Sequence, residues 1–158
     1  MASSVAVPEG AGRQTVLQWV VFHCTGRAFA FPLRTVREII RPQRFVRLPG
    51  TGPVVCGLAS LRGSIVTGFD LGIALGLSPS REVPDHRLLI LEQGERRVVF
   101  AVDGVKVVAT APIRKAGPRS RALQKLRVPA EAILGVGRVD GGEFVALDPA
   151  PILRGLLR

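Results

Sequence analysis

Short apolar runs, separated by turns that contain glycine or proline, recur at intervals of roughly 8–12 residues along this chain. Valine, which favours strands, is frequent in the runs, and 18 Gly and 12 Pro residues break the chain between them. The expected strands are residues 16–24, 28–31, 36–40, 54–59, 64–69, 88–91, 97–102, 105–109, 133–139 and 144–147. No apolar segment is long enough for a helix that crosses between parallel strands. The pattern therefore predicts an all-β sandwich or barrel protein.

Two aspartates stand immediately before short apolar segments that we expect to be helical. Asp70 precedes residues 71–75, which Gly76 ends, and Asp148 precedes residues 149–157. A carboxylate at this place accepts hydrogen bonds from the free N–H groups of the first helical turn. The protein is thus predicted to be mainly β with short helices.

The length of 158 residues fits one compact domain, which we expect over residues 15–158. Residues 1–14 are small or polar and are predicted to form a disordered tail. They lack the basic start and apolar core of a signal peptide. No run approaches the ~20 apolar residues of a spanning helix, so we expect a cytoplasmic protein without direct membrane insertion.

The net charge of +10 arises from 22 basic and 12 acidic residues. Such an excess attracts nucleic acid, acidic proteins or anionic membrane surfaces, and GC-rich codon usage is a sufficient cause for scattered arginines. Basic residues gather in residues 34–47 and 114–127. Binding to single-stranded nucleic acid also needs exposed aromatic rings, whereas most aromatics here stand in apolar strand runs. A nucleic-acid partner is therefore the weaker hypothesis.

The residues that carry catalysis or bind metals are too few and too scattered for a site. Ser60 lies in a Gly-x-x-Ser-x-x-Gly spacing, which is not that of a nucleophile elbow. The soft metal ligands are His23, Cys24, Cys56 and His86, and His23 and Cys24 are expected on opposite faces of a strand. Both cysteines are predicted to be reduced and buried. We therefore expect no enzyme, no bound metal and no cofactor.

One arginine, Arg62, stands alone among small and apolar residues in segment 57–71. Arg62 and Gly63 are expected to form a tight turn between two strands. The guanidinium suits either a bidentate contact with a partner or hydrogen bonds to the carbonyls of its own turn, and both roles remain open. Glu38 is likewise either a partner contact or a solvated carboxylate paired with Arg37 or Arg41.

Several motifs, in order, resemble the CheW family of chemotaxis coupling proteins over about residues 15–157. They are Val36-x-Glu38-Ile39, Gly57-x-x-x-Leu-Arg-Gly-x-Ile-Val-x-x-x-Asp-Leu71, Val102-Asp-Gly-Val105, Ile133 to Gly137 and Phe144 to Asp148. The resemblance implies two packed, five-stranded SH3-like β-barrels. We place lobe one at about residues 15–64 plus 148–158 and lobe two at about 65–147.

The resemblance also implies a non-catalytic adaptor that couples chemoreceptors to a CheA-type histidine kinase. The implied partners are the regulatory domain of that kinase, the cytoplasmic tip of the receptors and other CheW-like domains, in receptor arrays at the membrane. It suggests a partner face at Val36, Glu38 and Ile39. A groove for a receptor helix tip, near the junction of the lobes, would hold Gly57, Ser60, Arg62, Val102, Val105 and Val108.

Two departures from the family pattern support an alternative function. Ser60 stands where the family commonly has Asn, and Thr67-Gly68 stand where it commonly has a Pro-containing segment. Together with the charge of +10, they suggest a divergent adaptor of a non-flagellar motility or regulatory pathway, with an acidic or nucleic-acid partner.

Overall fold

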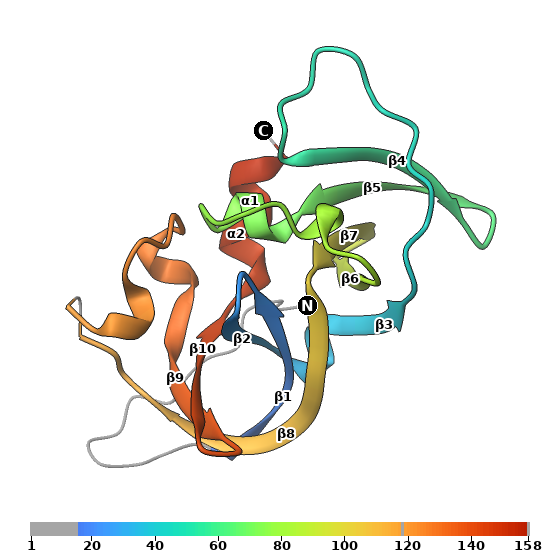
Figure 1. The fold of residues 1–158 in the computed structure, drawn as a ribbon. Helices are drawn as coiled ribbons and strands as arrows, with labels where there is room; N and C mark the ends of the chain where they lie inside the picture. Colours follow the sequence, from blue (N-terminus) through green and yellow to red (C-terminus); the bar gives the residue numbers. More distant parts are fainter. Residues whose placement is uncertain (1–15, 118, 158) are drawn as a thin grey trace.

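Two groups of five strands lie side by side in the computed structural model, which describes residues 16–117 and 119–157 (Figure 1). The predicted tail, residues 1–14, lies outside the described part of the chain. The protein is mostly β with short helices, as the spacing of apolar runs predicts.

The first group is a closed barrel in which the strands follow the order β1-β2-β10-β9-β8. Its strands are β1 (Val16–Cys24), β2 (Arg27–Pro32), β8 (Gly104–Arg114), β9 (Ile133–Val139) and β10 (Gly142–Leu147). All neighbours pair antiparallel except β2 and β10, which run parallel. Closure leaves no free strand edge in this barrel.

The second group is a sheet in the order β3-β6-β7-β5-β4. Its strands are β3 (Val36–Ile40), β4 (Val55–Leu61), β5 (Ser64–Asp70), β6 (Arg87–Gln93) and β7 (Arg96–Val102). The edge strands β3 and β4 do not pair with each other, but Val46, beyond β3, exchanges backbone hydrogen bonds of 2.7 and 2.9 Å with Leu58 of β4. The second lobe, which the resemblance predicted to be a barrel, is therefore a curled sheet whose two edges are connected by the Val46–Leu58 bridge.

The strands are divided between the groups differently from the expected lobes of residues 15–64 plus 148–158 and 65–147. The barrel combines residues 16–32 with 104–147, and the sheet holds residues 36–102. The expected boundary fell inside the β4–β5 hairpin, and the tight turn at Arg62-Gly63 keeps both strands in one sheet. The chain instead changes lobes after β2 and after β7.

Three hairpins are closed by two-residue turns in which both residues have positive φ. These are Thr25-Gly26, Arg62-Gly63 and Asp140-Gly141, with first-residue φ values of 53°, 50° and 49°. Turns of this type match the twist of the flanking strands. β5 and β7 run parallel without a long crossover helix, because β6 and two short helices connect them. The sheet thus holds one parallel pair among antiparallel ones and is not a parallel α/β sheet, as the absence of a long crossover helix predicts.

Both predicted helix starts are confirmed. Asp70 accepts a hydrogen bond from Ile73 N at the start of α1 (Leu71–Ala74), and Asp148 accepts one from Ala150 N at the start of α2 (Pro149–Leu156). The 3₁₀ turns are η1 (Leu33–Thr35), η2 (Ser80–Glu82), η3 (Arg121–Leu123) and η4 (Ala130–Ala132). In the described ranges no helix combines the length and the apolar character needed to cross a bilayer.

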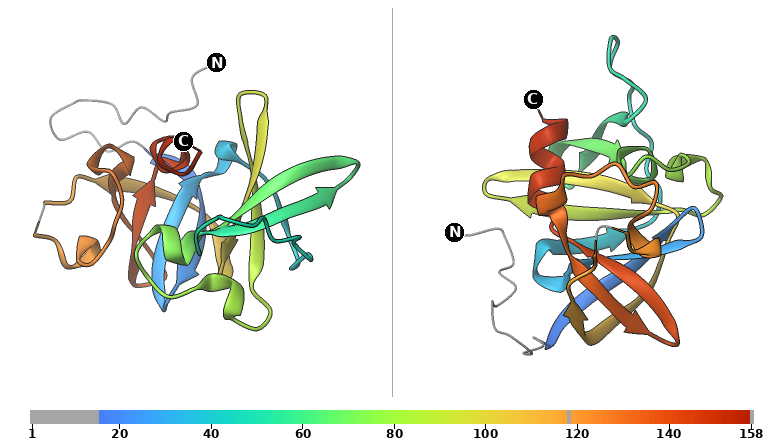
Figure 2. Two further views of the ribbon diagram at one scale, coloured as in Figure 1. Left: turned by 90° about the horizontal axis from the view of Figure 1, so that it is seen from above. Right: turned by 90° about the vertical axis from the view of Figure 1, so that its left-hand side faces the viewer.

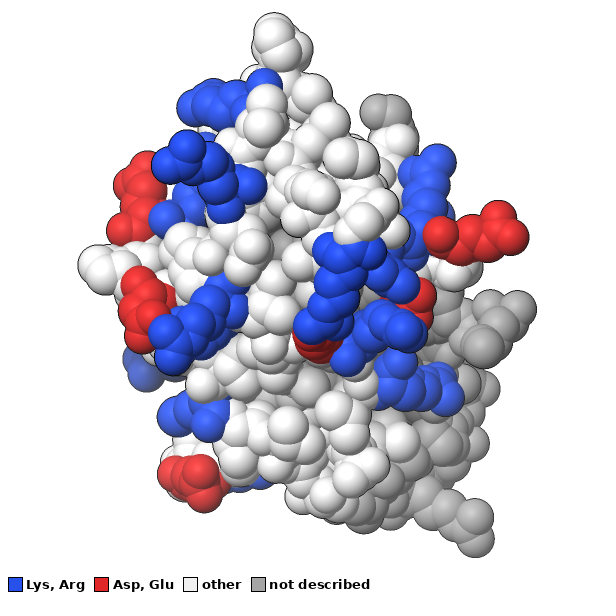
Figure 3. Space-filling view, turned by 90° about the vertical axis from the view of Figure 1, so that its right-hand side faces the viewer, with Lys and Arg blue, Asp and Glu red and all other residues white. Residues whose placement is uncertain are grey.

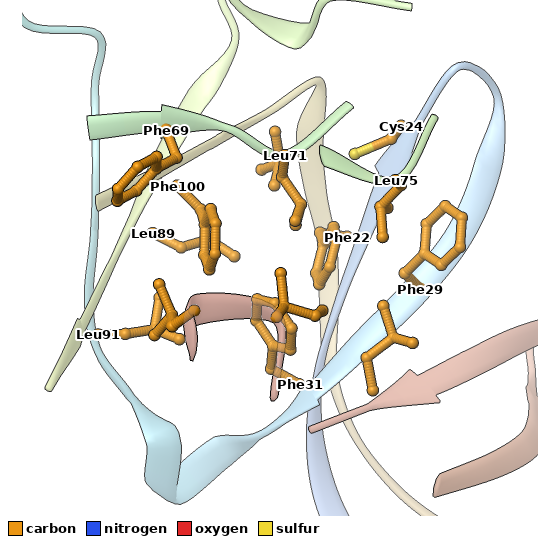
Figure 4. Close-up of a cluster of buried hydrophobic side chains, with 14 of the residues drawn as sticks. Phe22, Cys24, Phe29, Phe31, Phe69, Leu71, Leu75, Leu89, Leu91 and Phe100 are labelled. Carbon is orange, nitrogen blue, oxygen red and sulfur yellow. The ribbon is translucent and has the colours of Figure 1, made fainter. Parts of the chain in front are cut away.

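The largest hydrophobic cluster lies between the barrel and the sheet and includes residues of both (Figure 4). Phe100 of β7 lies 5.9 Å, between ring centroids, from Phe31 of β2 and 6.2 Å from Phe69 of β5. Figure 2 shows α2 in two views, and its Ile152 and Leu153 belong to the cluster. The two groups thus share one core.

Candidate functional site

Arg62 and Glu38 form a bidentate ion pair on the sheet. Arg62 Nη1 donates to Glu38 Oε1 at 2.5 Å, and Arg62 Nη2 donates to Glu38 Oε2. Arg62 lies at the turn of the β4–β5 hairpin, whereas Glu38 lies on β3 at the opposite edge of the sheet. The hydrogen bonds found for the Arg62 side chain go to this carboxylate and not to carbonyls of its own turn.

The pair is open to solvent, since 69% of the Arg62 side chain and 27% of the Glu38 side chain are exposed. Exposed ion pairs of this kind stabilise a fold by about 0.2–1 kcal/mol. Arg37, expected as one partner of Glu38, instead binds Glu92 at 2.7 Å. The arrangement therefore presents a fixed guanidinium and carboxylate at the surface. Removing either side chain should change the free energy of unfolding little.

Gly57 has a structural reason to be glycine. Its φ is +127°, and a Cβ atom there would overlap the backbone carbonyl of Val46. Gly57 pairs with Gly68 of β5, where a Cβ atom would overlap the ring of Phe45. The two glycines thus form a trough that receives residues 45–46. Gly68, a departure from the family pattern, is explained by Phe45, which the sequence analysis did not single out.

We expect Gly57→Ala to lower the free energy of unfolding by about 2–4 kcal/mol, since it combines backbone strain with a backbone clash. Gly63→Ala is the matched control, because Gly63 also has positive φ (+82°) but open space around its Cα. It should cost only about 1–2 kcal/mol. Urea denaturation, followed by the fluorescence of the single tryptophan, measures both losses. Equal losses would contradict the close packing of residues 45–46 against Gly57.

Two exposed apolar side chains lie on the strands next to the ion pair, but on the other face of the sheet from Glu38, because neighbouring strand residues point to opposite faces. Ile39, next to Glu38, is 39% exposed, and Ile65, three residues beyond Arg62, is 69% exposed. Ser60 is exposed and pairs with Ile65 across the hairpin. Val36 is half-buried and packs against the shared core. Of the predicted partner face, Glu38 and Ile39 are thus accessible.

The remaining predicted groove residues lie elsewhere. Val102 is fully buried at the end of β7, and Val105 is half-buried against the shared core. Val108 is 50% exposed on β8 of the barrel. The β4–β5 hairpin that carries Arg62 points away from that barrel (Figures 1 and 2). The structure therefore does not gather these residues and Arg62 into one groove at the lobe junction.

Opposite charges are interspersed on the face toward which the β4–β5 hairpin points (Figure 3). Arg37 and Arg97 both pair with Glu92, and on the barrel Arg114 pairs with Glu143 at 2.7 Å. Part of the positive charge is thus locally compensated. The aromatics Trp19, Phe22, Phe29, Phe31, Phe69, Phe100 and Phe144 are all buried. These rings are therefore not available to stack on nucleic-acid bases.

The residues considered for catalysis or metal binding stay apart. Among residues 16–117 and 119–157, no three His, Cys, Asp or Glu side chains gather as metal ligands. Both cysteines are free and buried, as predicted. Burial raises the pKa of Cys24 to about 12 and also raises the pKa of Cys56, so both remain neutral thiols at physiological pH.

Comparison with known proteins agrees with this architecture. The CheW-like domain family matches residues 18–156. Chemotaxis protein CheW of Bacillus subtilis is 33% identical over 92 residues, which are 58% of this chain and 58% of that protein. Protein PilI of Pseudomonas aeruginosa is 35% identical over 99 residues, 60% of this chain and 54% of that protein. The matched segments thus span a little over half of these curated relatives.

A solved structure has the same fold. The scaffolding protein CheW of Thermoanaerobacter tengcongensis aligns with a TM-score of 0.70 at 20% identity, covering 84% of this chain and 89% of that one. The fold is that of a protein class built from two small β lobes. The chain belongs to the CheW-like domain family of chemotaxis adaptors.

Proposed function

We propose that this chain couples chemoreceptors to a CheA-type histidine kinase in the cytoplasm, within receptor arrays. The observations that support this most are the exposed bidentate Arg62–Glu38 pair and the exposed apolar side chains of Ile39 and Ile65 on the other face of the same sheet. Apolar area supplies affinity for a partner, and a fixed charge pair supplies orientation. In a chain of this family, such a surface serves protein–protein contact.

The two accessible regions suit two different partners. The Arg62–Glu38 pair, at the open side of the sheet, would bind the regulatory domain of the kinase, with Ile39 and Ile65 adding apolar area on the other face of the same strands. Val108, exposed on the barrel, would contact a receptor helix tip, with half-buried Val105 on the same strand. Separate surfaces allow both partners to be bound at once, which is what coupling requires.

The proposal predicts that Arg62→Ala and Glu38→Lys each weaken binding to the kinase by about tenfold or more, because a charge-assisted contact is lost. The fold should survive, since the ion pair is exposed. Co-sedimentation with kinase and receptor fragments measures assembly, and circular dichroism monitors folding.

Arg37→Ala is the matched control, because it removes an equally exposed ion pair, that with Glu92, from the same strand. It should leave assembly unchanged. Unfolding of the Arg62→Ala protein would instead assign a structural role to Arg62, and absence of binding by the unmodified chain to either partner would refute the coupling role.

A second candidate function is that of a divergent adaptor in a non-flagellar motility or regulatory pathway. The net charge of +10 and the relative PilI, whose matched segment is 35% identical, favour it. An acidic protein partner then fits better than nucleic acid, because seven of the eight aromatic residues are buried. Pull-down with acidic and neutral partner fragments at physiological salt separates this pathway from kinase coupling.

A further inference from the structure

A cavity of about 260 Å³ opens in the sheet lobe between residues 43–47, the start of β4 and the segment after η2. Its apolar wall consists of the Phe45 ring, Val55, Cys56 and Ala101. This volume lies just below the range of about 300–1,000 Å³ that is usual for drug-sized ligands. The cavity therefore has room for a small molecule with an apolar body.

The lining also includes the ionisable side chains of Arg47, Arg81 and His86, and no acidic residue appears among the described residues of the lining. Two contacts hold the Arg81 side chain in place: its Nη1 donates to Pro53 O at 2.7 Å, and its Nε lies 4.0 Å from the carboxylate of buried Asp70. These contacts fix the guanidinium while leaving Nη2 without a described partner.

The other two basic side chains also keep unused donors or acceptors. His86 Nδ1 lies 3.0 Å from Val83 O, which can only accept, so Nδ1 carries a proton and Nε2 is left over. Arg47 is exposed and forms no ion pair within residues 16–117 and 119–157. Fixed donors beside an apolar wall suit an anionic group attached to an apolar body.

We propose that this cavity binds a small organic anion, with its acidic group on Arg47 and Arg81 and its apolar part against Phe45 and Ala101. Bound there, the ligand would hold residues 43–47 against β4, next to the Val46–Leu58 bridge. The site lies apart from the Arg62–Glu38 contact in its residues, and the coupling role neither requires nor excludes it.

The test is a titration of the full-length chain with benzoate, monitored by amide chemical shifts at physiological salt. A ligand of this size is expected to bind with a dissociation constant of about 1 mM. Shifts should saturate and concentrate at residues 43–47, 55–56, 81–86 and 101. Benzyl alcohol, which keeps the ring but lacks the charge, should bind at least about tenfold more weakly.

Arg47→Gln should raise the dissociation constant for benzoate by about tenfold. Arg44→Gln is the matched control, because Arg44 is an exposed arginine of the same segment that does not line the cavity. It should change the constant less than twofold. Equal effects of the two variants, shifts spread over the basic surface, or binding of benzyl alcohol as tight as that of benzoate would each overturn the proposal.

Discussion

Asp70→Ala is expected to lower the free energy of unfolding by about 3–5 kcal/mol. The Asp70 carboxylate is fully buried and accepts three backbone hydrogen bonds, from Ile73 N at 3.1 Å, Ser80 N at 2.9 Å and Arg81 N at 3.0 Å. One side chain thereby fixes both the start of α1 and the return of the chain toward β6. Its removal leaves these donors unpaired in a region that water reaches poorly.

Asp148→Ala is the control for this prediction. Asp148 occupies the corresponding position before α2, but its side chain accepts a hydrogen bond only from Ala150 N among the described contacts. Burial raises the pKa of Asp148, so its ionised form is already less favourable in the native state. The expected loss is about 0.5–2 kcal/mol. Urea denaturation measures the free energy of unfolding of both variants. Losses of equal size would contradict the claim that Asp70 stabilises the fold more than Asp148 does.

Phe100→Ala is expected to lower the free energy of unfolding by about 3–5 kcal/mol, because it opens a cavity in the core shared by the two lobes. The fluorescence of Trp19 measures the unfolding of the barrel. Trp19 is buried in the barrel, where its Nε1 donates to Ala111 O at 2.9 Å, and it belongs to a different cluster from Phe100. A lower urea midpoint of unfolding, as reported by Trp19 fluorescence, would show that the shared core couples the stability of the barrel to that of the sheet.

Ile90→Val serves as the control for Phe100. Ile90 lies on the neighbouring strand β6 in the separate cluster inside the sheet lobe. The expected loss is about 0.5–1.5 kcal/mol. If the midpoint reported by Trp19 stays unchanged in Phe100→Ala while the far-ultraviolet signal of the sheet shifts, the two lobes unfold independently and the prediction fails.

The local structure was largely predictable. The strand at residues 16–24, the hairpin turn at Arg62-Gly63 and the helix caps Asp70 and Asp148 depend on periodicity, turn chemistry and capping, which act over a few residues. These predictions are confirmed. The motif order also identified the family, because several short motifs in sequence are far more specific than one.

The site was only partly predictable. Sequence reasoning singled out Glu38 and Arg62, but it placed Arg62 near the lobe junction instead of at a hairpin turn pointing away from the barrel. It missed Phe45, since a lone aromatic in a loop with Pro42 and Pro49 carries no periodic signal. The missed clue was the pair Gly57 and Gly68, two glycines in adjacent strands where a third segment packs closely.

The sequence by itself determined which residues form strands, turns and caps, because those preferences arise from neighbours within a few positions. Only the tertiary structure decided how strands are divided between lobes, since β1 and β2 pair with β8 and β10 from the far half of the chain. It also decided that Arg62 binds Glu38 across the open side of a curled sheet. Long-range pairing reflects the burial of one shared core, which no local pattern encodes.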